Sequence, residues 1–163
     1  MNYHNIVHDD MLNGDGIRVT LFVSGCSLHC HNCQNPETWD KDSGIVFDED
    51  AVQEIFEELS KPYISGITLT GGHPLEHYNL FECTNLCKKI KEQFPKKTIW
   101  LYTGFIFENI KNYDILNFVD VVVDGSFVDT LKDVSLKWRG SINQRVIDVK
   151  QTKQQNKIVL HCD

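Results

Sequence analysis

The sequence predicts one α/β domain built on a mainly parallel sheet. Short runs rich in β-branched and aromatic residues alternate with amphipathic helical stretches, which is typical of βα units with right-handed crossovers. Clusters of glycine, proline and asparagine separate these runs. At 163 residues the chain is long enough to bury one core. We expect a single domain over residues 1–163, with its core at about 15–125 and a C-terminal loop and tail at 126–163.

Four runs are predicted to be strands. The first, from Arg18 to Ser24, is apolar on both faces, as buried parallel strands are. The segment before it, from Ile6 to Arg18, is predicted to be a loop because Asn13-Gly14-Asp15-Gly16 is a turn cluster. Further strands are expected at residues 66–70, 98–103 and 119–124, and residues 157–161 form either a last strand or an ordered tail.

Two longer helices and one short helical segment are expected between the strands. Asp48 has the character of an N-cap, and apolar residues then recur at helical spacing until Lys61-Pro62. A second helix, from about Leu80 to Phe94, places Cys83 and Cys87 on its apolar stripe. We interpret these two cysteines as small core residues rather than as a second metal site. Short helical packing is expected within residues 107–116.

The composition is that of a soluble globular protein, with 41% hydrophobic and 24% charged residues. No stretch approaches the roughly 20 apolar residues of a membrane span, and the N-terminus does not begin a signal peptide. We therefore expect a cytoplasmic protein with no membrane contact and no disulfides. The net charge of -7 argues against nucleic-acid binding, because phosphate contacts need clustered Lys and Arg.

Three cysteines directly follow the first predicted strand. Cys26, Cys30 and Cys33 are separated by three and then two residues. Three protein ligands leave one coordination position open for chemistry, whether the site holds zinc or a four-iron cluster. The alternatives are ordinary thiols, or a zinc site completed by His29, His31 or a distant cysteine.

Polar or glycine-rich segments also follow the other predicted strands. They are Gly71–His73, Thr103-Gly104 and Asp124-Gly125. The carboxyl ends of parallel strands share one edge of the sheet, where ligands bind in open α/β sheets and barrels. The sequence therefore predicts one pocket bordered by the cysteines, the glycine pair and two polar loops.

The cysteine triplet together with Gly71-Gly72 resembles the radical S-adenosylmethionine (SAM) superfamily. Three further stretches are similar to the glycyl-radical activases that serve anaerobic ribonucleoside-triphosphate reductase: Asn13-Gly14-Asp15-Gly16-Ile17-Arg18, Leu69-Thr70-Gly71-Gly72-x-Pro74-Leu75 and Trp138-Arg139-Gly140-Ser141-x-Asn143-Gln144-Arg145. The resemblance spans about Tyr3 to Arg145. Because a full eight-unit barrel takes about 250 residues, it implies an incomplete, splayed β/α barrel.

The resemblance also implies a chemistry. A 4Fe-4S cluster on Cys26, Cys30 and Cys33 would bind SAM at its open iron and split it with one electron, and the 5′-deoxyadenosyl radical would take a hydrogen from a glycine Cα of the large reductase subunit. A low-potential donor such as flavodoxin would supply the electron. The residues implied in SAM binding are Asn32, Cys33, Gln34, Gly71, Gly72, His73, Thr103 and Asp124, and those implied in docking the partner are Arg139, Asn143 and Arg145.

Three of these assignments have alternatives. His73 stands where the family usually has an acidic residue, and our hypothesis is that its imidazole accepts the SAM amino group in a weakened, pH-sensitive form, unless Glu76 or the backbone takes this role. Asp124 either contacts SAM or caps a helix. Arg139 and Arg145 either dock the reductase, anchor the SAM carboxylate or only pair with carboxylates of the chain itself.

Other functions are kept as rivals. One is activation of a different glycyl-radical enzyme of the pyruvate formate-lyase type. Another is a non-catalytic Cys/His metal-binding module, and a third is a relative that binds SAM without reacting it. The last two predict no 5′-deoxyadenosine product.

Overall fold

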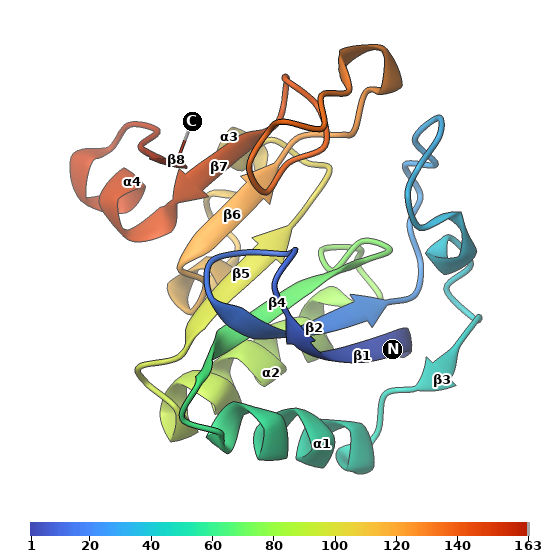
Figure 1. Cartoon of the computed structure of the whole chain (residues 1–163), viewed down its shortest axis with the longest axis vertical. Helices are drawn as coiled ribbons and strands as arrows, with labels where there is room; N and C mark the ends of the chain where they lie inside the picture. Colours follow the sequence, from blue (N-terminus) through green and yellow to red (C-terminus); the bar gives the residue numbers. More distant parts are fainter. Residues whose placement is uncertain (163) are drawn as a thin grey trace.

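A computed structural model, which describes residues 1–162, contains one open sheet of eight strands in the order β3-β1-β2-β4-β5-β6-β7-β8 (Figure 1). The strands are β1 (Asn2–Asp10), β2 (Ile17–Val23), β3 (Ile45–Val46), β4 (Ile64–Gly71), β5 (Thr98–Tyr102), β6 (Val121–Asp124), β7 (Arg145–Asp148) and β8 (Leu160–Cys162). The helices are α1 (Glu49–Ser60), α2 (Leu80–Gln93), α3 (Phe107–Ile110) and α4 (Val149–Gln155), with 3-10 turns at Pro36–Thr38, Asp114–Asn117 and Asp129–Leu131.

The four central strands, β2, β4, β5 and β6, are parallel. The flanking strands pair with antiparallel neighbours on both sides. The α/β class and the mainly parallel sheet are thus confirmed, and the sheet is not closed. Val23 at the end of β2 is in register with Gly71 at the end of β4. The segments that follow these two strands therefore leave the sheet side by side.

The two longer helices form as predicted. Asp48 Oδ1 accepts a hydrogen bond from the backbone N–H of Ala51 at 3.1 Å, which satisfies one of the unpaired donors at the start of α1. Phe56 of α1 meets Phe94, just after α2, in an edge-to-face contact with the ring centroids 5.6 Å apart. Cys83 and Cys87 are fully buried in the same core as both helices, as predicted. Burial raises the pKa of the Cys83 thiol to about 12, so it stays protonated.

The opposite face of the sheet carries a second, smaller cluster around Trp100. Arg18 lies beside it, is fully buried, and has its guanidinium 5.4 Å from the centre of the Trp100 ring. Its three nitrogens donate to the Thr68 hydroxyl and to backbone and side-chain oxygens of residues 15, 67 and 98. Burial lowers the pKa of Arg18 to about 10. These hydrogen bonds tie β2 to β4 and β5 on the face without helices.

Two regions differ from the sequence-based expectation. The segment from Ile6 to Arg18 is predicted to be a loop, but residues up to Asp10 belong to β1. Only Ile6 and Asp10 of β1 are buried, so the strand has no apolar alternation to reveal it. In the region 126–163, expected to be a loop and tail, β7 is an additional strand with Val146 and Ile147 buried, whereas β8 overlaps the last strand that was one of the two alternatives for residues 157–161. Within residues 1–162, no helix combines the length and the apolar character needed to cross a bilayer.

Candidate functional site

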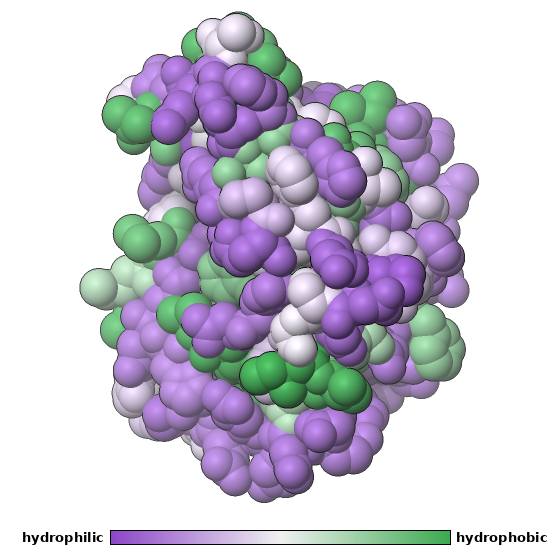
Figure 2. All heavy atoms as spheres, turned by 90° about the vertical axis from the view of Figure 1, so that its right-hand side faces the viewer, coloured by the Kyte–Doolittle hydropathy of each residue, from purple (hydrophilic) through white to green (hydrophobic). Residues whose placement is uncertain are grey.

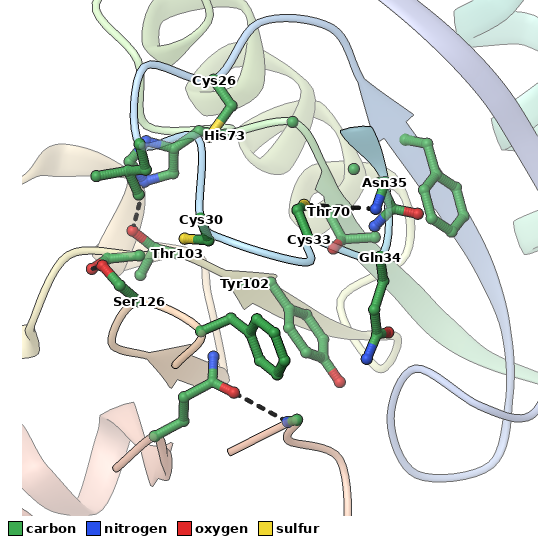
Figure 3. A pocket seen from close by; sticks show the side chains of 18 of the residues that line it. Cys26, Cys30, Cys33, Gln34, Asn35, Thr70, His73, Tyr102, Thr103 and Ser126 are labelled. Atoms are coloured by element: carbon green, nitrogen blue, oxygen red, sulfur yellow. Dashed lines mark hydrogen bonds between the residues drawn. The ribbon is translucent and has the colours of Figure 1, made fainter. Parts of the chain in front are cut away.

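A cavity of about 380 Å³ opens at the carboxyl ends of the parallel strands (Figure 3). Its volume is in the range of small-molecule sites, roughly 300–1,000 Å³. Cys26, Cys30 and Cys33 all line it. Part of the remaining wall comes from the ends of the other parallel strands and the segments after them, including Thr70, Gly71, Gly72, His73, Tyr102, Thr103, Gly104, Gly125, Ser126, Gly140 and Gln144. The single pocket predicted at this edge of the sheet is therefore present.

The cysteine loop is held by backbone hydrogen bonds rather than by regular structure. Cys26 N–H donates to the Trp39 carbonyl at 3.0 Å, and Cys33 N–H donates to the Cys30 carbonyl at 3.0 Å. His29 and Asn32 adopt left-handed backbone angles, which allow the chain to turn between the cysteines. The loop held in this way places all three cysteines on one cavity.

Two of the three sulfur atoms, those of Cys26 and Cys33, receive hydrogen bonds from backbone N–H groups of the loop. Cys33 Sγ accepts from the backbone N–H of Asn35 at 3.4 Å (Figure 3). Burial raises the pKa of the Cys26 thiol, while the backbone N–H groups of Leu28 and His29 act in the opposite direction. N–H groups aimed at cysteine sulfur stabilise thiolate, the form that ligates metal.

The donor set fits a cluster better than one ion. Within residues 1–162, no three His, Cys, Asp or Glu side chains converge as ligands of a single metal ion. In a four-iron cluster each thiolate binds a different iron, so three thiols spread along one cavity wall suit it. Cys26, Cys30 and Cys33 are the residues that would hold such a cluster.

The glycine pair brings backbone close to the cysteine loop. Gly71 has a φ of +96°, and a Cβ there would lie 2.7 Å from the Cα of Phe22. A Cβ on Gly72 would lie 2.6 Å from the carbonyl oxygen of Gly25. His73 N–H donates to the same Gly25 carbonyl at 2.7 Å. Only glycines permit this close approach, which leaves the cavity open beside the cysteines.

His73 is almost fully buried, with 1% of its surface exposed. Its Nε2 is 2.7 Å from the Thr103 hydroxyl (Figure 3), and its Nδ1 has no hydrogen-bond partner and lies 3.5 Å from Glu76 Oε1. Burial lowers the pKa of His73, although the Glu76 carboxylate opposes this. The imidazole is therefore neutral at physiological pH.

Glu76 is engaged by the cysteine loop. Its Oε1 accepts hydrogen bonds from the backbone N–H of Ser27, at 2.8 Å, and from the Ser27 hydroxyl. Burial raises the pKa of Glu76, but these bonds and His73 outweigh it and lower the pKa overall. Glu76 anchors the start of the cysteine loop and does not line the cavity.

Comparisons with known proteins agree with this geometry. A family model described as a 4Fe-4S single cluster domain matches residues 12–147, a range that includes every residue lining the cavity. The anaerobic ribonucleoside-triphosphate reductase-activating protein of Enterobacteria phage T4 is 47% identical over 146 residues, covering 90% of this chain and 93% of the relative. The proteins of that name from Escherichia coli K12 and Pasteurella multocida are 41% and 40% identical over 150 residues, covering 90% and 88% of this chain and 97% and 95% of the relatives.

This chain belongs to the anaerobic ribonucleoside-triphosphate reductase-activating protein family. The family predicted from the three sequence motifs is thereby confirmed, and membership of the radical SAM superfamily is consistent with it.

Six of the eight residues assigned to SAM binding lie on the cavity wall of this family member. They are Cys33, Gln34, Gly71, Gly72, His73 and Thr103. The other two, Asn32 and Asp124, do not line the cavity. Asn32 Nδ2 donates to Asp129 Oδ2 at 2.9 Å. Asp124 is buried and accepts from the Phe107 N–H at 2.8 Å, so it caps α3 and also pairs with Arg145.

The three residues assigned to partner docking are engaged within the chain. Arg145 forms hydrogen bonds with both Asp124 and Glu108, and these carboxylates raise its pKa. Arg139 Nη1 donates to the Gln144 carbonyl at 2.9 Å, and Asn143 Nδ2 donates to the Ser126 carbonyl at 2.8 Å. In this structure the side chains of the motif from Trp138 to Arg145 hold the loop together.

Several cavity residues were not singled out from the sequence. Tyr102, Ser126 and Gln144 are examples. Tyr102 ends β5 and Ser126 closely follows β6, both at the carboxyl edge of the sheet, and Gln144 belongs to the motif from Trp138 to Arg145. Position at that edge was thus a usable signal for Tyr102 and Ser126, and motif membership for Gln144.

Proposed function

We propose that this chain activates anaerobic ribonucleoside-triphosphate reductase by reductive cleavage of SAM. The cleavage takes place at a 4Fe-4S cluster held by Cys26, Cys30 and Cys33. The 5′-deoxyadenosyl radical that results then removes a Cα hydrogen from one glycine of the reductase. The observation that carries this proposal is the meeting of three thiols and the Gly71-Gly72 backbone at one cavity. Relatives named for this activation cover most of the chain, which favours the reductase over other glycyl-radical enzymes.

In this proposal the cysteines, the glycine pair and Thr103 have different roles. The cysteines hold the cluster, which when bound supplies the electron that splits SAM. Gly71 and Gly72 leave space for the charged methionine end of SAM beside the cysteine loop. Thr103 donates or accepts at His73 Nε2 and so fixes the orientation of the imidazole.

The open sheet suits a protein substrate. We propose that it is an incomplete, splayed radical SAM barrel, because an unclosed edge admits a loop of a large partner to the cavity. A low-potential donor such as flavodoxin would supply the electron, and the cytoplasm is the compartment that suits both partners and the reduced cysteines.

The experiment that tests this function is anaerobic reconstitution with iron and sulfide, followed by reduction with dithionite in the presence of SAM. We expect a brown protein that releases 5′-deoxyadenosine and, with the reductase added, a glycyl-radical signal in electron paramagnetic resonance. A colourless protein that holds zinc and leaves SAM intact would contradict the proposal and favour a metal-binding module.

SAM affinity is expected to fall as the pH drops below the pKa of His73. In this proposal the neutral imidazole accepts a hydrogen bond from the SAM amino group through the nitrogen that carries no proton, and protonation of the ring removes that acceptor. Because burial lowers this pKa from 6.5, the affinity should be constant near pH 7 and decrease in more acidic buffer. Isothermal titration of SAM between about pH 5 and pH 7 measures this change.

His73→Asn provides the control, since its amide does not titrate. Its affinity for SAM should be independent of pH over the same range. Glu76 stays ionised there because its pKa lies below its ordinary value of 4.5. Parallel pH profiles for the wild type and His73→Asn would show that His73 does not serve as the acceptor.

A further inference from the structure

The loop between β6 and β7, residues 126–144, forms one side of the cavity. Ser126, Phe127, Gly140 and Gln144 line the cavity from this loop. In Figure 1 the loop projects beyond the carboxyl end of β6, at the top of the molecule. Any group that reaches the cavity past this side must therefore contact the loop.

The loop is attached to other parts of the site at two positions, Asp129 and Trp138. Asp129 accepts the hydrogen bond from Asn32, in the cysteine loop, at 2.9 Å. Trp138 Nε1 donates to Asp15 Oδ1 at 3.1 Å, and the Tyr102 hydroxyl donates to the Trp138 carbonyl at 2.7 Å. Two of the motifs recognised in the sequence, 13–18 and 138–145, thus meet in space through Asp15 and Trp138.

The loop is also cross-linked internally. Gln144 Oε1 accepts from the N–H groups of Gly140 and Ser141, at 2.9 and 3.1 Å, and its Nε2 donates to the Gly125 carbonyl at 2.9 Å. Lys132 and Ser141 form an antiparallel bridge. A loop ordered in this way loses little conformational freedom when a partner binds.

Exposed apolar side chains occur on this loop and on the β1–β2 loop, which the Trp138–Asp15 hydrogen bond joins to it. We name this group the docking rim; it consists of Met11, Leu12, Leu131, Val134 and Ile142. Among residues 1–162 these are five of the eleven large hydrophobic side chains that are exposed, although the two loops are a small part of the chain. Val134 is 91% and Leu12 82% exposed, and Leu12 also lines the cavity.

The rim is apolar rather than charged. Within residues 126–144 the two aspartates nearly balance the three basic residues. Lys137 lies 3.5 Å from Asp15, and Arg139 is bonded within the loop. Figure 2 shows a largely hydrophilic face whose main hydrophobic area lies in the lower half, with only scattered hydrophobic side chains at the upper end. Apolar side chains held exposed on an ordered loop are typical of protein contacts.

We propose that the docking rim binds the large subunit of the reductase, through an apolar surface that surrounds its glycine-bearing segment. This inference rests on the proposed function, because hydrogen abstraction requires a glycine Cα to enter the cavity that the rim borders. It replaces the three polar residues suggested by the sequence, Arg139, Asn143 and Arg145, as the contact surface. Recognition by apolar contact should depend only weakly on salt.

The test uses Val134→Glu and Ile142→Glu, singly and together, since neither side chain lines the cavity. Affinity for the reductase subunit is measured by sedimentation, and glycyl-radical formation by electron paramagnetic resonance. Tyr63→Glu is the matched control, because Tyr63 is 51% exposed but precedes β4, at the opposite end of the sheet from the cavity. Melting temperatures establish that each variant is folded.

We expect the double variant to bind the reductase at least about tenfold more weakly, which corresponds to about 1.4 kcal/mol. Radical formation should fall in parallel at limiting reductase and recover at high reductase concentration. SAM cleavage by dithionite without the reductase should be unchanged, and Tyr63→Glu should match the wild type in every assay.

Unchanged reductase affinity in the double variant would overturn the proposal. So would a wild type that self-associates through the rim, with monomeric variants that bind the reductase normally. If the wild type binds the reductase through the rim but releases no 5′-deoxyadenosine, the proposed function fails while the docking surface stands.

Discussion

A Cys30→Ala chain is expected to lose its iron–sulfur cluster and, with it, all cleavage of SAM. Cys30 is one of the three thiols that line the cavity in the described part of the chain, residues 1–162. With two thiols left, a second iron lacks a protein ligand. Substitution of groups that merely support a ligand costs about 10–100-fold in metal affinity or activity, and loss of the ligand itself should exceed that. Iron and sulfide content after anaerobic reconstitution, with the visible absorption spectrum, measure the loss.

Cys162→Ala is the matched control for this experiment. Cys162 lies in β8 and does not line the cavity, so the variant should take up iron and sulfide like the wild type. Cys83 and Cys87 are less suitable, because both are fully buried in the core and their truncation would disturb folding. A Cys30→Ala protein with wild-type iron and sulfide content would show that the cluster is not held by this triplet.

Much of the sheet follows from local patterns in the sequence. The runs at β2, β4, β5 and β6 are rich in apolar residues at successive positions, as is typical of parallel strands that are buried on both faces. Once these strands are taken as parallel, their carboxyl ends must share one edge, so the cysteines and the glycine pair are brought to one cavity without further assumption. The strands that local patterns do not predict, β1, β3 and β7, have only antiparallel partners; β1 has two buried residues, and β3 and β7 are only two and four residues long.

The side chains missed or misplaced by sequence reasoning have partners that are distant in the chain. Asn32 stands between two cysteines, yet its amide bonds to Asp129, 97 residues away. Asp124 ends a strand at the cavity edge, yet its carboxylate turns to Arg145 and to the first N–H of α3. Burial makes such pairing necessary, because an unpaired buried carboxylate is costly, but no local pattern tells which partner is within reach.

The motif from Trp138 to Arg145 also shows that a sequence does not reveal which group a polar side chain will bind. Arg139, Asn143 and Arg145 are polar residues in or next to a predicted loop, which favours the hypothesis of a docking role. The structure shows that each donates to an oxygen within the chain, and that the exposed residues of the loop include Val134 and Ile142 as well as polar ones such as Lys132 and Asn143. Whether an arginine faces a partner or its own chain depends on tertiary contacts.

Gly71→Ala is expected to lower both the stability of the chain and its affinity for SAM. An alanine at φ +96° carries a backbone strain of about 1–2 kcal/mol. Its Cβ would also lie 2.7 Å from the Cα of Phe22 and 2.8 Å from the N of Val23, which are backbone atoms of β2. Forced separation of packed groups costs about 1–3 kcal/mol more. We expect a total loss of about 2–5 kcal/mol in the free energy of unfolding, measured with urea.

Gly125→Ala separates strain from steric clash. Gly125 also lines the cavity and has a φ of +92°, but the nearest atoms to a Cβ there are 3.7 Å away. This variant should lose only the roughly 1–2 kcal/mol of backbone strain. The clash at Gly71 pushes on the end of β2, from which the cysteine loop begins, so Gly71→Ala should also bind SAM at least about tenfold more weakly than Gly125→Ala, or about 1.4 kcal/mol. Equal effects of the two substitutions on stability and SAM affinity would mean that the close approach of β4 to β2 does not shape the cavity.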